Sequence, residues 1–183
     1  MRALTKQGTR ALAAAAGLCL LAAGAGAQGS AGKEAASAWL KTDSTAKTAE
    51  FTVIAGLTPL NAGMNFDGAK DGGLTLTVPE GWTVVLHVRN NDQMLPHSVE
   101  VIRDSQPIPV GPVTPAFAHA ATSNLAGGLS AEAKQDVRFI AAQAGNYIIF
   151  CAVPGHGAAG MWVRLVVSPA AKGPTLVASA AKP

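Results

Sequence analysis

Two strand-like runs joined by one short loop constrain the fold of this chain more than any other feature. Residues 147–151 (YIIFC) and 161–167 (MWVRLVV) are rich in the β-branched and aromatic residues that strands favour. The loop between them carries Cys151, His156 and Met161 at five-residue intervals, with Pro154 and Gly155 to shape its turn. Two strands and one loop therefore hold a thiol, an imidazole and a thioether close together.

A second imidazole completes this set of donors. His97 lies in residues 95–98 (LPHS), directly before another strand-like run, so it can arrive from a neighbouring part of the same domain. Two histidines, one cysteine and one weakly held methionine are the ligands of a blue-copper electron-transfer site. The soft sulfur ligands suit Cu(I), and imidazole suits both oxidation states. The sequence therefore predicts one copper ion held by His97, Cys151, His156 and Met161.

The rest of the chain alternates between short apolar runs and turn residues. Short strands separated by Gly, Pro and Asn, without a long helix, predict an all-β antiparallel sandwich built as a single domain. Strand alternation also predicts that Phe150 faces away from Cys151 and packs inside the protein. The expected strands cover residues 51–54, 74–78, 83–89, 98–102, 136–140, 147–151 and 161–167.

The first residues have the pattern of a secretory signal peptide. Arg2, Lys6 and Arg10 precede an apolar run over residues 11–23, and residues 25–27 form an A-x-A cleavage site. The apolar run has 13 residues, whereas a spanning helix needs about 20. We therefore expect cleavage after Ala27 and an exported protein, periplasmic or extracytoplasmic. Membrane association is expected only if the leader is retained.

The mature chain divides into three parts. Residues 28–50 are expected to form a flexible N-terminal arm, residues 51–167 the β domain, and residues 168–183 a disordered tail. Within the domain, residues 106–133 are rich in Pro and then in Ala, Gly and Ser, and they interrupt the strand pattern as a long insertion. The sequence assigns no role to this insertion.

The charge balance and the cysteine content argue against a nucleic-acid-binding protein and against a fold held by disulfides. The chain has 14 basic and 11 acidic residues, and the leader holds three of the basic ones and no acid. The mature chain is thus balanced at 11 of each, with no basic stripe for nucleic acid. Loss of the leader also leaves Cys151 as the single thiol, so no internal disulfide can form.

With the motifs in hand, a family resemblance is plain. Pro-His-Ser at residues 96–98, followed by Cys-x4-His-x4-Met at 151–161, resembles the cupredoxins. Within that family the chain is most similar to the sulfocyanins and next to the rusticyanins. The sulfocyanin likeness depends on residues 63–68 (GMNFDG), 150–156 (FCAVPGH) and 160–162 (GMW).

The resemblance implies a Greek-key β-sandwich or barrel with one type 1 copper. It implies equatorial ligation by His97, Cys151 and His156, with Met161 as the axial ligand. Ser98 follows the first ligand, as serine does in rusticyanins, whereas sulfocyanins often have Asn at this position. We expect its hydrogen bonds to tie the two ligand loops together and tune the redox potential.

The function implied is electron transfer rather than catalysis. The copper would cycle between Cu(I) and Cu(II) and connect redox partners of a respiratory chain. A c-type cytochrome and the copper-accepting subunit of a terminal oxidase are the partners that this resemblance implies. His156 is expected to be the exit point for the electron, and the protein is expected to be a monomer.

Other interpretations of the same residues stay open at this point. A periplasmic copper carrier or buffer would use the same ligands. Zinc also accepts Cys and His, although structural zinc usually takes four strong N or S ligands. The remaining candidates, His87 and His119, are expected to be structural or exposed, and Met64 and Met94 to provide apolar packing.

Overall fold

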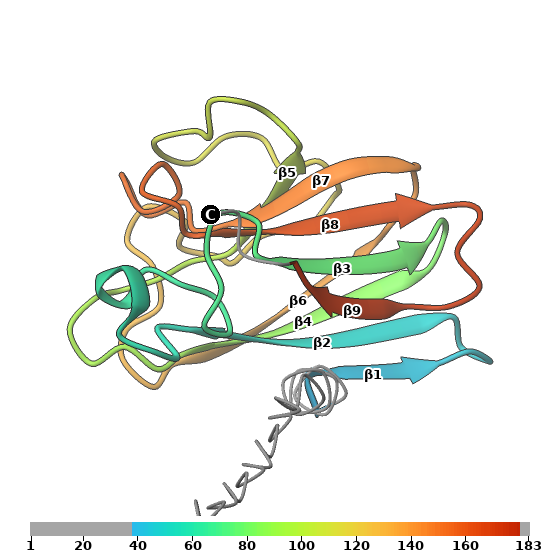
Figure 1. Ribbon diagram of the computed structural model, residues 1–183, viewed down its shortest axis with the longest axis horizontal. Coiled ribbons are helices and arrows are strands. Elements are labelled where there is room, and N and C mark those ends of the chain that lie inside the picture. The colour runs from blue at the N-terminus through green and yellow to red at the C-terminus, as the bar shows by residue number, and fades with distance from the viewer. Residues whose placement is uncertain (1–37, 180–183) are drawn as a thin grey trace, which may run out of the picture.

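The computed structural model describes residues 38–179, which form two β-sheets packed face to face (Figure 1). One sheet has four strands in the order β1-β2-β4-β6, and the other has five in the order β5-β7-β8-β3-β9. The four-stranded sheet contains β1 (Leu40–Asp43), β2 (Thr48–Ala55), β4 (Thr83–Asn90) and β6 (Lys134–Ile140). The five-stranded sheet contains β5 (Glu100–Arg103), β7 (Gly145–Phe150), β8 (Trp162–Ser168), β3 (Leu74–Pro79) and β9 (Thr175–Ala178).

The all-β fold and seven predicted strands are confirmed, but the expected antiparallel pairing is wrong at two places. β2 pairs with β4 in parallel, and so does β3 with β8. In each case the chain crosses between the sheets before it returns to the neighbouring strand, and local sequence patterns do not record such a crossing. The sheets are therefore mixed.

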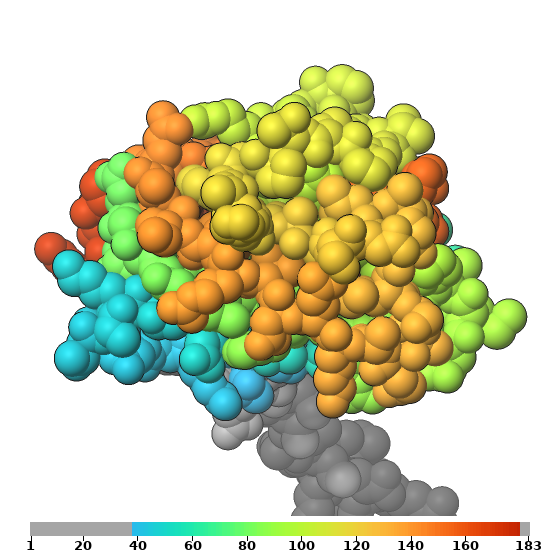
Figure 2. Space-filling model, turned by 180° about the vertical axis from the view of Figure 1, so that it is seen from behind, coloured from blue at the N-terminus to red at the C-terminus, as the bar shows by residue number. Residues whose placement is uncertain are grey.

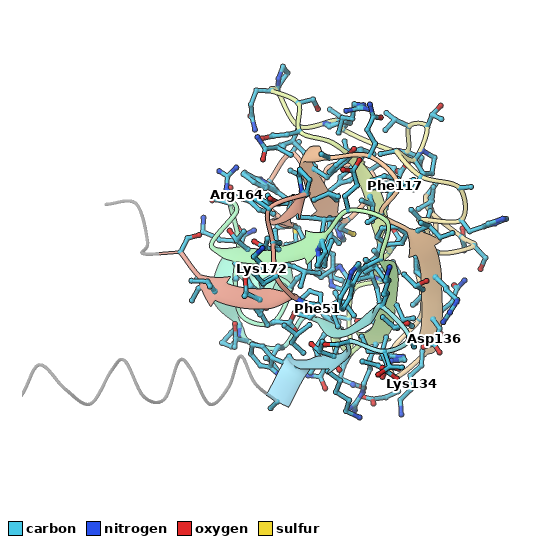
Figure 3. All side chains as sticks on the ribbon, turned by 90° about the vertical axis from the view of Figure 1, so that its right-hand side faces the viewer. Phe51, Phe117, Lys134, Asp136, Arg164 and Lys172 are labelled. Carbon is cyan, nitrogen blue, oxygen red and sulfur yellow. The ribbon has the colours of Figure 1, made fainter. Side chains whose placement is uncertain are left out.

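Apolar side chains from both sheets fill the space between them. Along β2 burial alternates, so that Phe51 and Val53 are fully buried and Thr52 between them is half-buried. Figure 3 shows Phe51 inside the sandwich, whereas Lys134 and Asp136 of β6 point outwards. Fully burying a side chain of this size contributes about 1.5–3 kcal/mol, so this core holds the two sheets in place.

The loops that carry the predicted ligands leave the sandwich at one end. The loops after β4 and after β7 meet there, next to the short 3-10 turn η1 (Leu60–Gly63), at the left in Figure 1. The side chain of Asn61 in η1 donates a hydrogen bond to the carbonyl of Ala159 at 2.9 Å. Three separate segments are thus connected at this end of the fold.

The insertion, residues 106–133, runs along β5 instead of projecting into solvent. The amides of Ala116 and Thr122 donate to the carbonyls of Val101 and Val99, at 2.8 and 2.9 Å. In return, the amide of Val101 donates to the carbonyl of Ala120 at 2.9 Å. These bonds extend the five-stranded sheet beyond β5.

A second apolar cluster lies beneath the insertion, on the face of the sheet opposite the main core. Phe150 belongs to this cluster while Cys151 belongs to the main core, so the predicted alternation is confirmed. Figure 2 shows the insertion, in yellow, spread over the upper part of the molecule on that side. The cluster consists of Ile102, Ile148, Phe150, Ala152 and Trp162, with Ile108 and Leu125 from the insertion packed against it.

Two segments that were expected to lack regular structure contain strands. β1 and the first residues of β2 lie within the expected arm, residues 28–50, and β9 lies within the expected disordered tail, residues 168–183. β1 is mostly exposed and β9 buries only Leu176, so neither has the alternation of a half-buried strand. Both are edge strands, held by pairing with β2 and β3 respectively.

The predicted signal peptide, residues 1–27, lies outside the described residues. Within residues 38–179, no helix is long and apolar enough to cross a membrane.

Candidate metal centre

Three of the four predicted ligands meet at the end of the sandwich. Nδ1 of His97 lies 3.8 Å from Sγ of Cys151, and Nδ1 of His156 lies 3.6 Å from the same sulfur. The two Nδ1 atoms are 3.2 Å apart. Two nitrogens and one sulfur thus form a nearly equilateral triangle, with donors supplied by two different loops.

This triangle has the size that a metal ion requires. An ion at about 2.0 Å from each nitrogen and about 2.3 Å from the sulfur, in the plane of the three, separates them by roughly 3.5–3.7 Å. The observed separations of 3.2, 3.6 and 3.8 Å bracket that range. Among the described residues, these three are the one group of His, Cys, Asp or Glu side chains placed to hold a metal.

Met161, the fourth predicted ligand, lies at the end of the same loop. It is fully buried in the main core and directly precedes β8. The amide of Cys151 donates to its carbonyl at 3.0 Å, and its own amide donates to the carbonyl of His156 at 3.0 Å. These two bonds close the loop on itself and fix the three ligand-bearing residues along it.

Close packing inside the loop requires glycine at one position. A Cβ on Gly157 would lie 2.5 Å from Cδ2 of Phe150 and 3.0 Å from the carbonyl oxygen of Cys151. The loop therefore folds directly onto the last residue of β7.

His97 is held from both sides. Its amide and carbonyl pair with the carbonyl and amide of Leu129 in the insertion, at 3.2 and 2.7 Å. Its ring is buried, and Nε2 lies 3.4 Å from Oδ2 of Asp92. With Nε2 directed to a carboxylate, Nδ1 is the nitrogen that faces the thiol.

Ser98 connects the two ligand loops, as expected. Its amide donates to Sγ of Cys151 at 3.4 Å, and its hydroxyl oxygen lies 3.9 Å from the same sulfur. The hydroxyl also accepts a hydrogen bond from the amide of Ala152 at 3.1 Å. The thiol is thereby fixed from the side of the first histidine.

Burial sets the protonation of all three donors. It lowers the pKa of His97 and of His156, so both imidazoles are neutral at neutral pH. It raises the pKa of the Cys151 thiol, although hydrogen bonds from Ser98 and the amide of Val153 act in the opposite direction. A metal that binds here must displace the thiol proton.

The other histidines and methionines lie elsewhere. His87 is on the outer face of the four-stranded sheet between Glu50 and Asp136, and His119 is exposed, as predicted. Met64 packs against the main core, as expected, but Met94 is 87% exposed and the packing predicted for it is wrong. Met94 lies in the tight turn before His97, at the surface of the metal end.

Two residues at the site escaped the sequence patterns. Asp92 belongs to the sequence Asn-Asn-Asp at residues 90–92, which predicts a turn. Its place five residues before His97 is the only feature of the sequence that could have connected it with the ligand. Val110 was part of the unassigned insertion, yet its carbonyl accepts a hydrogen bond from the amide of Gly155 at 2.7 Å. The insertion therefore supports the loop directly beside His156.

Comparison with known proteins agrees with this architecture. The family model of the sulfocyanin (SoxE) domain matches residues 35–178. The sulfocyanin of Sulfolobus acidocaldarius is 31% identical over 132 residues, which are 68% of this chain and 66%, just under two thirds, of that protein. Rusticyanin from Thiobacillus ferrooxidans shares 24% identity at a TM-score of 0.51, over 71% of this chain and 86% of that one. A rusticyanin variant shares 24% identity at a TM-score of 0.52, over 76% and 92%.

A two-sheet sandwich with a His, Cys and His donor set at one end, which also superposes on rusticyanin, is a cupredoxin. The resemblance inferred from the loop motifs is thus confirmed. The match over residues 35–178 narrows the assignment: the chain belongs to the sulfocyanin (SoxE) family. Cupredoxins bind one type 1 copper ion, and the donors described above fit that cofactor.

Proposed function

We propose that this chain is a blue-copper electron carrier, with copper held by His97, Cys151 and His156 and with Met161 as the axial ligand. The observation that supports the proposal is the triangle formed by Nδ1 of His97, Sγ of Cys151 and Nδ1 of His156, on two loops that hydrogen bonds hold in place. When bound, copper supplies a one-electron couple between Cu(I) and Cu(II). The sulfur ligands favour Cu(I) and the imidazoles accept both states.

The protein's own task is to keep the donors still while the charge of the site changes. Ser98 fixes the thiol, Leu129 and Asp92 fix His97, and the Val110 carbonyl supports the loop before His156. Because each donor already has its position, little rearrangement accompanies a change of oxidation state. Such an arrangement suits repeated electron transfer.

His156 is the proposed exit for the electron. Its side chain is half-buried, whereas His97, Cys151 and Met161 are buried. The loops around it, residues 93–99, 105–131 and 151–163, contain no Asp, Glu, Lys or Arg. The charged side chains beside them, Asp71 next to Gly160 and Lys70, pair with each other at 2.9 Å. Exposed apolar side chains lie on the neighbouring loops: Leu60, Met94 and Val110.

This face suits brief contact with a redox partner whose own rim is also uncharged. We propose a c-type cytochrome or the copper-accepting subunit of a terminal oxidase as partner, in a respiratory chain. On the basis of the predicted leader, we propose that the protein is exported, periplasmic or extracytoplasmic, and acts as a monomer.

A copper carrier or buffer is the less favoured alternative. A carrier must release its ion to an acceptor, which calls for an open site. Here three ligands are buried and each loop is held by several hydrogen bonds. Copper transfer on mixing with a copper-free acceptor protein would support the carrier over the electron carrier.

The direct test is to load the purified mature protein with Cu(II) and record its visible absorption and EPR spectra. We expect an intense thiolate-to-copper charge-transfer band with a narrow copper hyperfine splitting, and we expect Cys151→Ser to abolish both. A colourless protein with ordinary Cu(II) signals would contradict the proposal. A His156→Gly variant, compared at equal copper loading, tests the exit route: transfer rates to a partner that remain unchanged would rule it out.

A further inference from the structure

The ring of His97 has a charged neighbour on the side away from the thiol. Oδ2 of Asp92 lies 3.4 Å from Nε2 of His97, and both side chains are shielded, with exposed fractions of 13% and 1%. Within residues 38–179, this is the one carboxylate in contact with any of the three donor side chains. The inference below depends on the copper site proposed above.

Asp92 is held as firmly as the ligands themselves. Its Oδ1 accepts hydrogen bonds from the amides of Met94 and Leu95, at 2.8 and 3.0 Å. Its own amide donates to the side chain of the buried Asn90 at 2.9 Å. A Cβ added to Gly63, which has φ +85°, would overlap Oδ2, so glycine at this position leaves room for the carboxylate. The carboxylate therefore has one orientation, with Oδ1 directed to the turn and Oδ2 to His97.

The hydrogen-bond chemistry of a metal-bound imidazole gives this contact a role. When Nδ1 binds a metal, the ring proton must be on Nε2, which then needs an acceptor because the ring is buried. Oδ2 of Asp92 is that acceptor. Burial on its own would raise the pKa of Asp92, but hydrogen bonds from the amides of Met94 and Leu95 and from His97 outweigh it and hold the pKa below its usual value.

We propose that Asp92 is a positioning residue that fixes His97 with its proton on Nε2 and sets the redox potential of the site through its negative charge. A carboxylate one imidazole ring away from the metal stabilises the more highly charged Cu(II) relative to Cu(I). The reduction potential is therefore lower than it would be with a neutral acceptor. The alternative role, in which Asp92 only closes the turn over residues 92–95, predicts no effect on the potential.

The first variant is Asp92→Asn in the copper-loaded protein. The amide oxygen still accepts from Met94 and Leu95, so the turn is retained, and the amide nitrogen then faces Nε2–H of His97, donor against donor. We expect the midpoint potential to rise by about 59 mV, which corresponds to a tenfold change in the ratio of affinities for Cu(II) and Cu(I). Redox titration of the visible absorption band measures it.

Two further variants separate charge from folding. Asp92→Ser retains an oxygen that can accept from the turn amides but has no group to reach His97, so it should raise the potential as well. Asp71→Asn is the matched control: Asp71 also lies at the metal end, where its amide donates to the carbonyl of Gly160, but its side chain contacts no donor ring. The control should leave the potential unchanged.

Zinc binding provides a readout independent of redox chemistry. Loss of the acceptor for Nε2–H should weaken Zn(II) binding to the copper-free protein by about 10- to 100-fold in both Asp92 variants. If these variants fold and keep wild-type potential and zinc affinity, the inference is overturned. If the wild-type protein shows no blue band, but the Asp92 variants bind zinc more weakly than the wild type, the proposed function fails while the positioning role of Asp92 stands.

Discussion

The amide of Ser98 lies 3.4 Å from Sγ of Cys151, and the hydroxyl of the same serine accepts a hydrogen bond from the amide of Ala152 at 3.1 Å. One residue thus contacts both the sulfur donor and the backbone that follows it. Because Ser98 directly follows His97, this residue also connects the two ligand loops. Its replacement should affect both the redox potential and the stability.

Ser98→Ala removes the hydroxyl and leaves the backbone contact to sulfur. The buried amide of Ala152 then has no acceptor, which costs about 1–3 kcal/mol in free energy of unfolding. Loss of the weak hydroxyl contact also leaves more electron density on the sulfur, so Cu(II) is favoured and the midpoint potential should fall. Urea denaturation of the copper-free protein and redox titration of the loaded protein measure the two effects.

Ser123→Ala is the control for this variant, since the exposed Ser123 bonds to the side chain of Gln135, far from the ligands in sequence and in no contact with them. It should change neither quantity. A Ser98→Ala protein with wild-type potential and spectrum would show that the hydroxyl does not tune the site.

Gly157→Ala tests the packing of the ligand loop. The added Cβ would lie 2.5 Å from the ring of Phe150, so the loop or the ring must move. Overpacking of this kind costs about 1–3 kcal/mol, and the shifted loop should bind copper more weakly. Gly173→Ala is the matched control, because no atom lies within 4 Å of the Cβ it would add. Equal stability of the two variants would contradict the contact.

Asp67 makes the stability depend on pH. Its carboxyl is buried, and burial raises its pKa to about 8, against a hydrogen bond from the amide of Ile54 that lowers it. The folded protein therefore keeps this proton up to about pH 8, whereas the unfolded chain releases it near pH 4. Between these values the folded state binds more protons, so the free energy of unfolding falls as pH rises, by up to about 1.4 kcal/mol per pH unit.

Asp67→Asn should remove this dependence. The amide oxygen still accepts from Ile54, and Asn tolerates the left-handed backbone, φ 53°, at this position. We expect a flatter stability profile between pH 4 and 8, and a variant more stable than the wild type at pH 8. Denaturation of the copper-free proteins at several pH values measures it, with the exposed Asp43→Asn as control. A wild-type profile that rises over this interval would refute the assignment.

Val110→Asp tests the proposed docking face. The loops around His156 carry no charged side chain and the neighbouring Lys70 and Asp71 compensate each other, so the rate of electron transfer to a c-type cytochrome should change little with ionic strength. A charge at Val110, beside the His156 loop, should slow transfer about tenfold, equivalent to 1.4 kcal/mol, and make it dependent on salt. Val177→Asp, at a similarly exposed valine on β9, is the control. Equal slowing by both variants would place the docking face elsewhere.

The strands that could be predicted from the sequence are those in which apolar and polar residues alternate. β2, β3 and β8 alternate between the core and the outside, and this alternation is visible in the chain. β1 and β9 were missed because an edge strand that buries one side chain or none needs no apolar period. The parallel pairs were missed because pairing between strands distant in sequence depends on the crossing of the whole chain.

The candidate site divides in the same way. Cys151, His156 and Met161 could be found because one loop brings them together, and His97 because a proline and a strand flank it. Asp92 could not, since one of its carboxylate oxygens closes an ordinary turn while the other reaches His97. Only the three-dimensional course of the loop after β4 directs that second oxygen to the ligand.

The apolar cluster under the insertion should constrain how both the cluster and the insertion change in evolution. Phe150 and Trp162 belong to the strands that flank the ligand loop, and the insertion covers them with Ile108 and Leu125. A homologue that lost the insertion would expose this apolar patch to water. Deletion of the insertion should therefore be accompanied by polar replacements in the patch. Insertion and patch are thus expected to be inherited together.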